Sequence, residues 1–484
     1  QLWWGHRVPV WYDADGVAVA SRTELRLGDP HPKTGKPITR QDPDVLDTWA
    51  SSWLWPFATL GWPDLTDDLQ RFYPTQFLST ARDILYLWVA RMVMAGYEFQ
   101  DHLPESQRCP FETCYVHATV LDAKGRRMSK SLGNGIDPIE MIDKYGADAV
   151  RYSLILLTKE GQDVKLSPDR FEQGWRFGNK VWNAARFVLM NLEGERGAGT
   201  SASAQLLEDR WILSRLAATR AEVSLALEEH RYNEAASELY RFVWNDFCDW
   251  YLEIVKPRML SKIDPTSGTA RGVLARVLGD SLALLHPFTP YMTEVLAKAL
   301  DERLGRSAPM LMNAKWPDGA GIARDEAAEA EMETIQGLVR AVRSLRLLTE
   351  IPERKPLKAK VAAPRAGERT VLTKNAPTVQ ALAFLEPFEV AETVERQAGW
   401  APAVAGSVEV FVQLEGEVDF EKLRESLARR CEKLKSGLAA CDAKLANAAF
   451  VERADPQIVE DERARRAEMA AELALLERIL AGFN

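Results

Sequence analysis

With 484 residues the chain is too long to fold around one hydrophobic core, and its length suggests roughly three domains. Hydrophobic residues make up 46% and charged residues 27% of the sequence, which is typical of a soluble, folded protein. The formal net charge of −9 argues against nonspecific nucleic-acid binding through bulk charge. No apolar run approaches the roughly 20 residues of a membrane helix, so we expect no membrane partner.

Residues 1–60 are rich in Trp and Pro and predict short strands and loops. We expect strands at Val8–Trp11 and Val17–Ala20, followed by a turn-prone stretch at His31–Pro37. The sequence opens on Gln-Leu-Trp-Trp-Gly-His, with no Met, signal peptide or transit-peptide composition. A surface-seeking terminus rarely begins with two tryptophans, so we expect this to be the interior of a longer chain.

From Pro74 to about Leu166, apolar helices alternate with short strands, which is the pattern of an α/β layer. Apolar spacing predicts a helix over Ser79–Met94, a strand over Cys114–Val120 and a second helix over Pro138–Thr158. We place the end of this first domain at residue 168.

A helical period dominates the next part of the chain, and we predict an all-α bundle over residues 169–318. The expected helices are Phe177–Leu192, Leu206–His230, Glu234–Leu260, Thr269–Leu285 and Met292–Leu304, with a break at Pro287 and Pro290.

Two smaller segments complete the chain. Residues 319–415 predict a long helix at Glu326–Leu348 and a small α/β subdomain, with strands at Lys358–Ala362 and Val408–Leu414. In residues 416–484, apolar residues step by three and four on both sides of a break at Asp455-Pro456. Two helices with one narrow apolar stripe each predict an antiparallel coiled-coil hairpin.

The most specific motif is Asp122-Ala-Lys-Gly-Arg-Arg-Met-Ser-Lys-Ser-Leu-Gly-Asn134, directly after a predicted strand. Such a loop offers a triphosphate mobile positive charge, hydroxyl donors and exposed backbone N–H groups. A positioned Lys stabilises the charge that builds on departing pyrophosphate more in the transition state than in the ground state.

This loop resembles the second signature motif of class I aminoacyl-tRNA synthetases, whose usual form is Lys-Met-Ser-Lys-Ser. The resemblance implies that Lys130 and Arg127 are catalytic and that Met128, Ser129, Ser131 and His117 bind ATP or the adenylate. Arg127 departs from the usual Lys, which keeps the charge and changes the donor geometry. Taken alone, His117 would more often be a strand residue with a local partner.

Two segments resemble the valyl-tRNA synthetase family in particular, Asp42–Phe57 and Pro74–Val89. The resemblance implies that Trp49, Ile84 and Trp88 wall a pocket for a branched aliphatic side chain and that Asp83 holds the ribose hydroxyls of the adenylate. Taken alone, these three apolar residues would be core and Asp83 an ion-pair partner. Ala50 and Ala81 depart from the usual aromatic residue and the usual Gly, and Ala81 could crowd the backbone near the adenylate.

The resemblance extends to the rest of the chain. Asn179–Phe187, Trp244–Tyr251 and Leu285–Tyr291 resemble an anticodon-binding helical domain, and the predicted hairpin resembles the tRNA-binding arm of valyl enzymes. It implies ATP with Mg²⁺, valine and tRNA(Val) as ligands and a monomeric, cytoplasmic enzyme. Cys109 and Cys114 lie five apart with no second Cys/His pair nearby, so we expect no protein-bound zinc and mostly buried, reduced thiols.

The family's first signature, His-x-Gly-His, does not occur in this sequence, and neither does an editing domain. We therefore expect the fold to begin with the C-terminal part of a Rossmann-like catalytic domain, and the fragment to be inactive unaided. The alternatives are a non-catalytic tRNA-binding module, a split-synthetase subunit, or an isoleucyl- or leucyl-specific relative.

Overall fold

The computed structural model describes residues 5–158, 162–192, 206–261, 263–319, 321–416, 418, 420–447, 450 and 456–481. Contacts divide the chain into two compact units. The first comprises Gln1–Gly146, Val150–Gln173 and Ala226–Glu234, and the second comprises Ala147–Ala149, Gly174–Leu225 and Ala235–Asn484. Within the described part, no helix is long and apolar enough to cross a membrane.

The first unit begins with a three-stranded antiparallel sheet in the order β2-β1-β3, formed by β1 (Val10–Asp13), β2 (Ala18–Ala20) and β3 (Ile38–Gln41). Trp11, Val19 and Ile38 are its buried cluster. The two predicted strands are confirmed, each shifted by one or two residues. The third follows the predicted turn.

Further along the chain, the first unit contains a parallel pair of strands, β4 (Thr75–Ala81) and β5 (Phe111–His117). Between them, the chain forms η1 (Arg82–Ile84), the π-helical η2 (Leu85–Val89), α4 (Ala90–Phe99) and η3 (Glu105–Gln107). Three short helices come before β4 in the chain: α1 (Thr48–Ser52), α2 (Trp55–Ala58) and α3 (Asp67–Phe72).

The predicted helix over Ser79–Met94 is therefore wrong at its start, because Ser79–Ala81 belong to β4. Leu78 and Thr80 are buried while Phe77 and Ser79 are exposed, which is the alternation of a strand. Hydrogen bonding to β5, whose paired residues lie 36 positions further along the chain, overrides the local helical spacing.

The predicted helix over Pro138–Thr158 is interrupted. It consists of α5 (Pro138–Tyr145) and α6 (Ala147–Leu157), separated by Gly146 at φ = 90°. Only Gly adopts such a backbone angle without strain, so the break follows from the residue type. Two short parallel strands, β6 (Val120–Leu121) and β7 (Val164–Lys165), lie on either side of these helices in the sequence.

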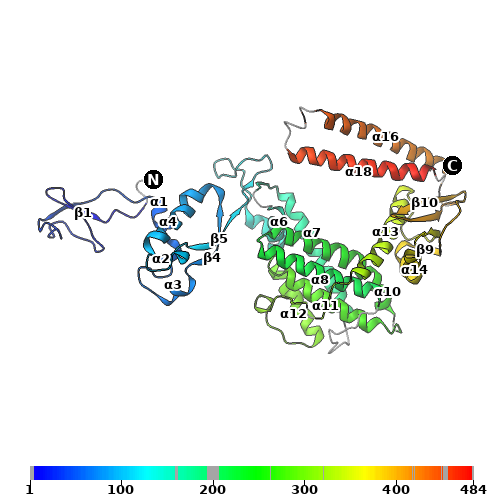
Figure 1. Cartoon of the computed structure of the whole chain (residues 1–484), viewed down its shortest axis with the longest axis horizontal. Helices are drawn as coiled ribbons and strands as arrows, with labels where there is room; N and C mark the ends of the chain where they lie inside the picture. Colours follow the sequence, from blue (N-terminus) through cyan, green and yellow to red (C-terminus); the bar gives the residue numbers. More distant parts are fainter. Residues whose placement is uncertain are drawn as a thin grey trace. The chain divides into compact units, whose positions relative to one another are not determined.

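The second unit is mostly helical, as predicted, and the helices that precede its sheet pack together as a bundle (Figure 1). The short η4 (Pro168–Arg170) still belongs to the first unit. The helices that follow it, before the small sheet, are α7 (Phe171–Asn191), α8 (Leu207–Glu228), α9 (Tyr232–Tyr240), η5 (Arg241–Tyr251), α10 (Leu252–Leu260), α11 (Ser267–Leu285), α12 (Pro290–Leu304), η6 (Leu311–Asn313) and α13 (Glu326–Leu348). The predicted helix Glu234–Leu260 contains a π-helical stretch, η5, that its apolar spacing did not indicate.

A buried ion network joins α8 to α10. The Arg258 guanidinium donates to Asp209 at 2.9 and 3.0 Å and to Glu208 at 3.0 Å, and Asp209 also accepts from the Tyr251 hydroxyl at 2.7 Å. Asp209 is fully buried and Arg258 is 8% exposed. Such groups are tolerated in a core only when each charge is paired.

The small subdomain is a four-stranded sheet in the order β10-β11-β8-β9, with α13 packed against β10 and β11 (Figure 1). Its elements are β8 (Leu357–Ala362), α14 (Ala366–Lys374), α15 (Ala376–Ala383), β9 (Leu385–Ala391), β10 (Trp400–Ala405) and β11 (Val408–Gln413). The two predicted strands are the central ones. The two that sequence reasoning missed are the edge strands, and each contains a proline, Pro387 or Pro402.

Near the end of the chain, the helices α16 (Phe420–Ala446) and α18 (Pro456–Ala481) run antiparallel (Figure 1). Arg430 pairs with Glu472 at 2.5 Å and Lys444 with Glu462 at 3.4 Å, so partners later in one helix are earlier in the other. Cys431, Cys441 and Leu476 are buried. The predicted break lies partly outside the described residues, since Asp455 is not among them.

Candidate functional site

Two of the predicted site residues, His117 and Asp83, lie at or just after the carboxyl ends of the paired strands β5 and β4. Ala81 and His117 are paired in register at these ends, and Asp83 follows two residues after Ala81. The His117 ring is exposed, with Nδ1 at 3.0 Å from the Ala118 carbonyl oxygen. In parallel sheets, ligands bind outside the carboxyl ends of the strands, so this edge is the expected side for a nucleotide.

The loop Arg126–Asn134, called the signature loop below, follows a tight turn after β6. The Asp122 backbone N–H donates to the Arg126 carbonyl at 2.8 Å, and Gly125 adopts φ = 77°. Arg127 forms an isolated antiparallel β-bridge with Leu121. Met128 packs against the buried cluster of Met141, Val150, Leu166 and Phe171. One apolar side chain thus anchors the loop, while Arg127, Lys130 and Ser131 are exposed.

The cations of the signature loop differ in their partners. Arg127 lies 2.6 Å from the Asp83 carboxylate, so the structure joins two predicted site residues that are 44 positions apart. Lys130 is exposed, and no carboxylate within the described residues pairs with it. The Ser129 and Ser131 hydroxyls lie 3.2 Å apart beside it. An unpaired ammonium next to two hydroxyls is available for an anionic ligand.

The predicted amino-acid pocket residues lie on neighbouring segments. Trp49 is on α1, Ile84 ends η1 and Trp88 is in η2, and all three are half-buried. Helix α1 packs against η2, and the Trp88 indole N–H donates to the Ser52 carbonyl at 3.1 Å. This hydrogen bond and a 6.1 Å ring contact with Trp55 fix the orientation of Trp88.

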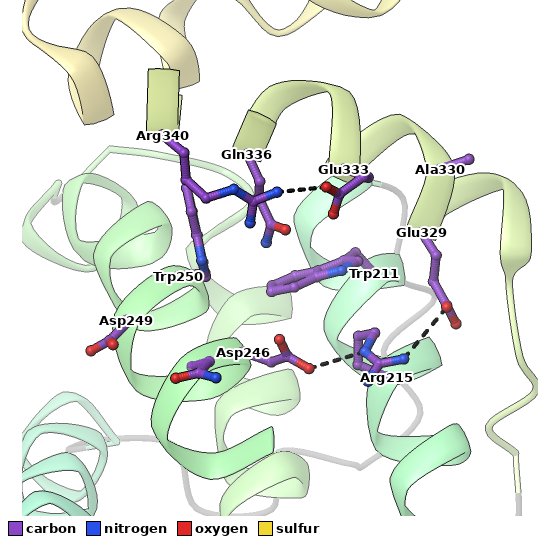
Figure 2. Close-up of a pocket in the computed structure, with 11 residues that line it drawn as sticks. Trp211, Arg215, Asp246, Asp249, Trp250, Glu329, Ala330, Glu333, Gln336 and Arg340 are labelled. Atoms are coloured by element: carbon purple, nitrogen blue, oxygen red, sulfur yellow. Dashed lines mark hydrogen bonds and ion pairs between the residues drawn. The ribbon is translucent and has the colours of Figure 1, made fainter. Parts of the chain in front are cut away.

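The structure also has a cavity of about 650 Å³ that sequence reasoning did not predict. It is lined by α8, η5 and α13, and Figure 2 shows Arg215 between Asp246 and Glu329, at 3.0 and 3.6 Å. Burial raises the pKa of Asp246. Carboxylates outnumber guanidinium groups in its lining by four (Asp246, Asp249, Glu329, Glu333) to two (Arg215, Arg340), which disfavours a phosphate ligand.

Only part of this cavity could have been found in the sequence. The run Trp244–Tyr251 contains more polar residues than is usual for a helix in a core. It supplies four lining residues of the cavity: Asn245, Asp246, Asp249 and Trp250. The remaining lining residues come from two other helices, and no spacing rule links three segments. Among the described residues, no group of three His, Cys, Asp or Glu side chains could hold a metal ion.

Comparisons with known proteins agree along the whole chain. A family model of class I tRNA synthetases (I, L, M and V) matches residues 1–167, one of the anticodon-binding domain of tRNA ligases matches 209–361, and one of the valyl tRNA synthetase tRNA-binding arm matches 419–484. The valine–tRNA ligases of Carboxydothermus hydrogenoformans and Thermotoga maritima are 41% and 42% identical to it over 99% of its length. The chain is similar to valyl-tRNA synthetases along nearly all of its length.

The chain spans 53% of the length of each of these two relatives. Among solved structures, the Agrobacterium radiobacter LeuRS, determined in a ternary complex with tRNA and LeuAMS, is 19% identical with a TM-score of 0.53. That match covers 67% of this chain and 41% of the other, and it supports the fold alone.

Proposed function

We propose that this chain supplies the phosphate-binding loop, the anticodon-binding domain and the tRNA-binding arm of a valine–tRNA ligase. The observation that carries the proposal is the signature loop, whose exposed Lys130 lies in a segment joined to Asp83 at the carboxyl ends of β4 and β5. The identity to valine–tRNA ligases along 99% of the chain supports the choice of amino acid.

In the proposed reaction, a carboxylate oxygen of valine attacks the α-phosphorus of ATP, the bond to the bridging oxygen breaks and pyrophosphate leaves. Lys130 would stabilise the negative charge that develops on pyrophosphate, with Arg127 as a second cation. A terminal ribose hydroxyl of tRNA(Val) then attacks the carbonyl carbon of valyl-adenylate and AMP leaves. Mg²⁺ would enter with ATP, since phosphate oxygens are its natural ligands.

The remaining predicted site residues have proposed roles in binding. Asp83 would accept hydrogen bonds from the ribose hydroxyls, and His117 would face the adenine. Met128, Ser129 and Ser131 would also bind ATP or the adenylate. Trp49, Ile84 and Trp88 would form the apolar wall for valine. Such a wall distinguishes one methylene by only about 1–3 kcal/mol, so it would reject threonine poorly.

The proposed organisation keeps four parts: a catalytic part over residues 1–168, a helical anticodon-binding bundle over 169–318, a linker helix with a small α/β subdomain over 319–415, and an antiparallel coiled-coil arm over 416–484. The arm and the bundle would contact tRNA, and the full enzyme would be a cytoplasmic monomer. The ion pairs across α16 and α18 support a hairpin arm.

Amino-acid-dependent exchange of pyrophosphate into ATP tests the proposal. The chain would be assayed alone and mixed with the N-terminal half of the Thermotoga maritima valine–tRNA ligase, with valine, isoleucine or leucine. We expect exchange with valine in the mixture, and a roughly 100-fold loss in Lys130→Ala. Exchange only with isoleucine or leucine would assign the other specificity.

Binding of the chain alone to transcripts of tRNA(Val) and tRNA(Leu) tests the alternative function, a non-catalytic tRNA-binding module. Tight binding to tRNA(Val) without exchange in any mixture would favour a non-catalytic tRNA-binding module. Equal affinity for both transcripts would contradict the valine assignment.

A further inference from the structure

Asn134, the last residue of the signature loop, forms hydrogen bonds with three earlier residues, one before the loop and two within it. Its amide Nδ2 donates to Asp122 Oδ2 at 2.9 Å and to the Arg127 carbonyl oxygen at 3.1 Å. Its Oδ1 accepts the Ser129 backbone N–H at 2.9 Å. The amide nitrogen of Asn134 thus donates two hydrogen bonds and the amide oxygen accepts one, so both polar atoms of the side chain have partners.

Asp122, the acceptor for Asn134, is itself held firmly. It is 7% exposed, and it accepts the backbone N–H groups of Lys124 and Arg126 at 2.9 and 2.8 Å and the Arg126 Nε–H at 2.9 Å. The hydrogen bond from Asn134, followed by those from Arg126, holds the pKa of Asp122 well below its usual range. The carboxylate is therefore ionised, and a hydrogen bond to an ionised acceptor is stronger than a neutral one.

The segment between the tied positions is a single exposed turn. The Leu132 N–H donates to Ser129 Oγ and the Gly133 N–H to the Lys130 carbonyl, both at 3.3 Å, and Gly133 adopts φ = 60°. Lys130 and Ser131 lie on the exposed part of this turn. Fixing both ends of so short a segment restricts the positions that the Lys130 ammonium can reach.

We propose that Asn134 is a positioning residue for polyphosphate binding, because its contacts with Asp122, Arg127 and Ser129 hold the backbone on both sides of Lys130. The proposal rests on the proposed function of the loop, in which Lys130 binds the phosphates of ATP. A loop that is ordered before its ligand arrives loses less conformational entropy on binding, so removing these contacts weakens binding without removing a cation.

The experiment uses the full chain and two readouts: hydrogen–deuterium exchange of the peptide that contains Ser129, and calorimetric affinity for inorganic tripolyphosphate. In Asn134→Ala we expect exchange and dissociation constant each to rise by about tenfold, which corresponds to loss of a hydrogen bond to a charged group. Ile139→Ala, at an exposed position of α5, is the matched control and should change neither.

A reciprocal exchange of the two side chains separates positioning from general damage to the fold. Asn134→Asp alone places two carboxylates together and should be at least as disruptive as Asn134→Ala. In the double variant Asp122→Asn/Asn134→Asp, the amide at position 122 can donate to the carboxylate at position 134. We expect it to recover part of the protection and part of the affinity.

The two readouts also separate this proposal from the proposed function. Unchanged exchange in Asn134→Ala, or faster exchange with unchanged tripolyphosphate affinity, would overturn the positioning role while leaving the loop's function intact. If the wild-type chain and the control bind no tripolyphosphate, the phosphate-binding function of the loop fails and the role of Asn134 in it fails too. Faster exchange with weaker binding, recovered in the double variant, supports both.

Discussion

The guanidinium of Arg127 lies 2.6 Å from the carboxylate of Asp83, which joins the signature loop to the segment that follows β4. The side chains are 69% and 47% exposed, so the pair is well solvated. Asp83 is the residue proposed to accept the ribose hydroxyls of ATP. A bound nucleotide would therefore compete with Arg127 for the same carboxylate.

Arg127→Lys introduces the residue that is usual at this position in class I synthetases. We expect the free energy of unfolding, measured with urea, to change by less than about 0.5 kcal/mol, because exposed ion pairs contribute about 0–1 kcal/mol. Asp83→Asn should behave in the same way. A loss above about 1 kcal/mol in either variant would show that the pair is a structural element of the unit.

Gly96→Ala should destabilise the first unit by about 1–3 kcal/mol through overpacking. A Cβ at this position of α4 would clash with the Arg108 carbonyl oxygen and lie 2.8 Å from the Tyr73 hydroxyl. Gly178→Ala in α7 is the matched control, since its Cβ would meet nothing closer than Met292 Sδ at 3.9 Å. It should stabilise by about 0.5–1 kcal/mol, and calorimetric melting of both variants measures the contrast.

Arg258→Met should lower the stability of the helical bundle by about 3–5 kcal/mol, because it leaves the buried carboxylates of Glu208 and Asp209 without their partner. Arg340→Met breaks the ion pair with Glu333, whose side chains are 50% and 68% exposed, and should cost less than about 1 kcal/mol. Equal urea midpoints for these variants would contradict the ranking.

The cysteines should differ sharply in their reaction with iodoacetamide at pH 8. Cys114 is exposed, whereas Cys248 is buried and burial raises its pKa to about 12, so its thiolate fraction is roughly 10⁻⁴ at that pH. Peptide mass spectrometry after short labelling should find Cys114 modified and Cys248 intact. Modification of Cys248 at the rate of Cys114 in the folded chain would argue against its buried position.

The signature loop should keep its protection from hydrogen exchange between pH 7 and about pH 4. The lowered pKa of Asp122 means that its ionised form stabilises the folded loop fully above the unfolded-state pKa, near 3.9. That contribution shrinks as the pH falls below this value and disappears below the folded-state pKa. Protection corrected for intrinsic rates should show this dependence in the wild type and lose it in Asp122→Asn.

Local patterns were sufficient for much of the fold. The helix Glu326–Leu348 is predicted with its true ends, because Asp325 caps it through the Ala328 N–H and apolar residues recur along one face. The strands β8 and β11 were found because they are central, apolar and free of Pro. Elements that depend on distant partners were missed or misread, as at Ser79–Ala81, where pairing with β5 decides the conformation.

The candidate site shows the same division. The resemblance to class I synthetases pointed to Lys130, Arg127 and His117, but it could not show that Arg127 contacts Asp83 or that Asn134 reaches Asp122. Those contacts depend on how the chain turns at Gly125 and Gly133, both at positive φ, and on the packing of Met128. Without the resemblance, Asp83 was expected to be an ion-pair partner; it is one, with a partner outside its own helix.

The two prolines in the edge strands of the small sheet have a consequence for the chain at high concentration. A proline has no backbone N–H, so β9 and β10 each present an interrupted row of donors at the borders of the sheet. A strand from a second molecule would therefore lack one backbone donor at each border. Among the described residues neither border pairs with a further strand, so these two prolines are features that disfavour growth of the sheet by polymerisation.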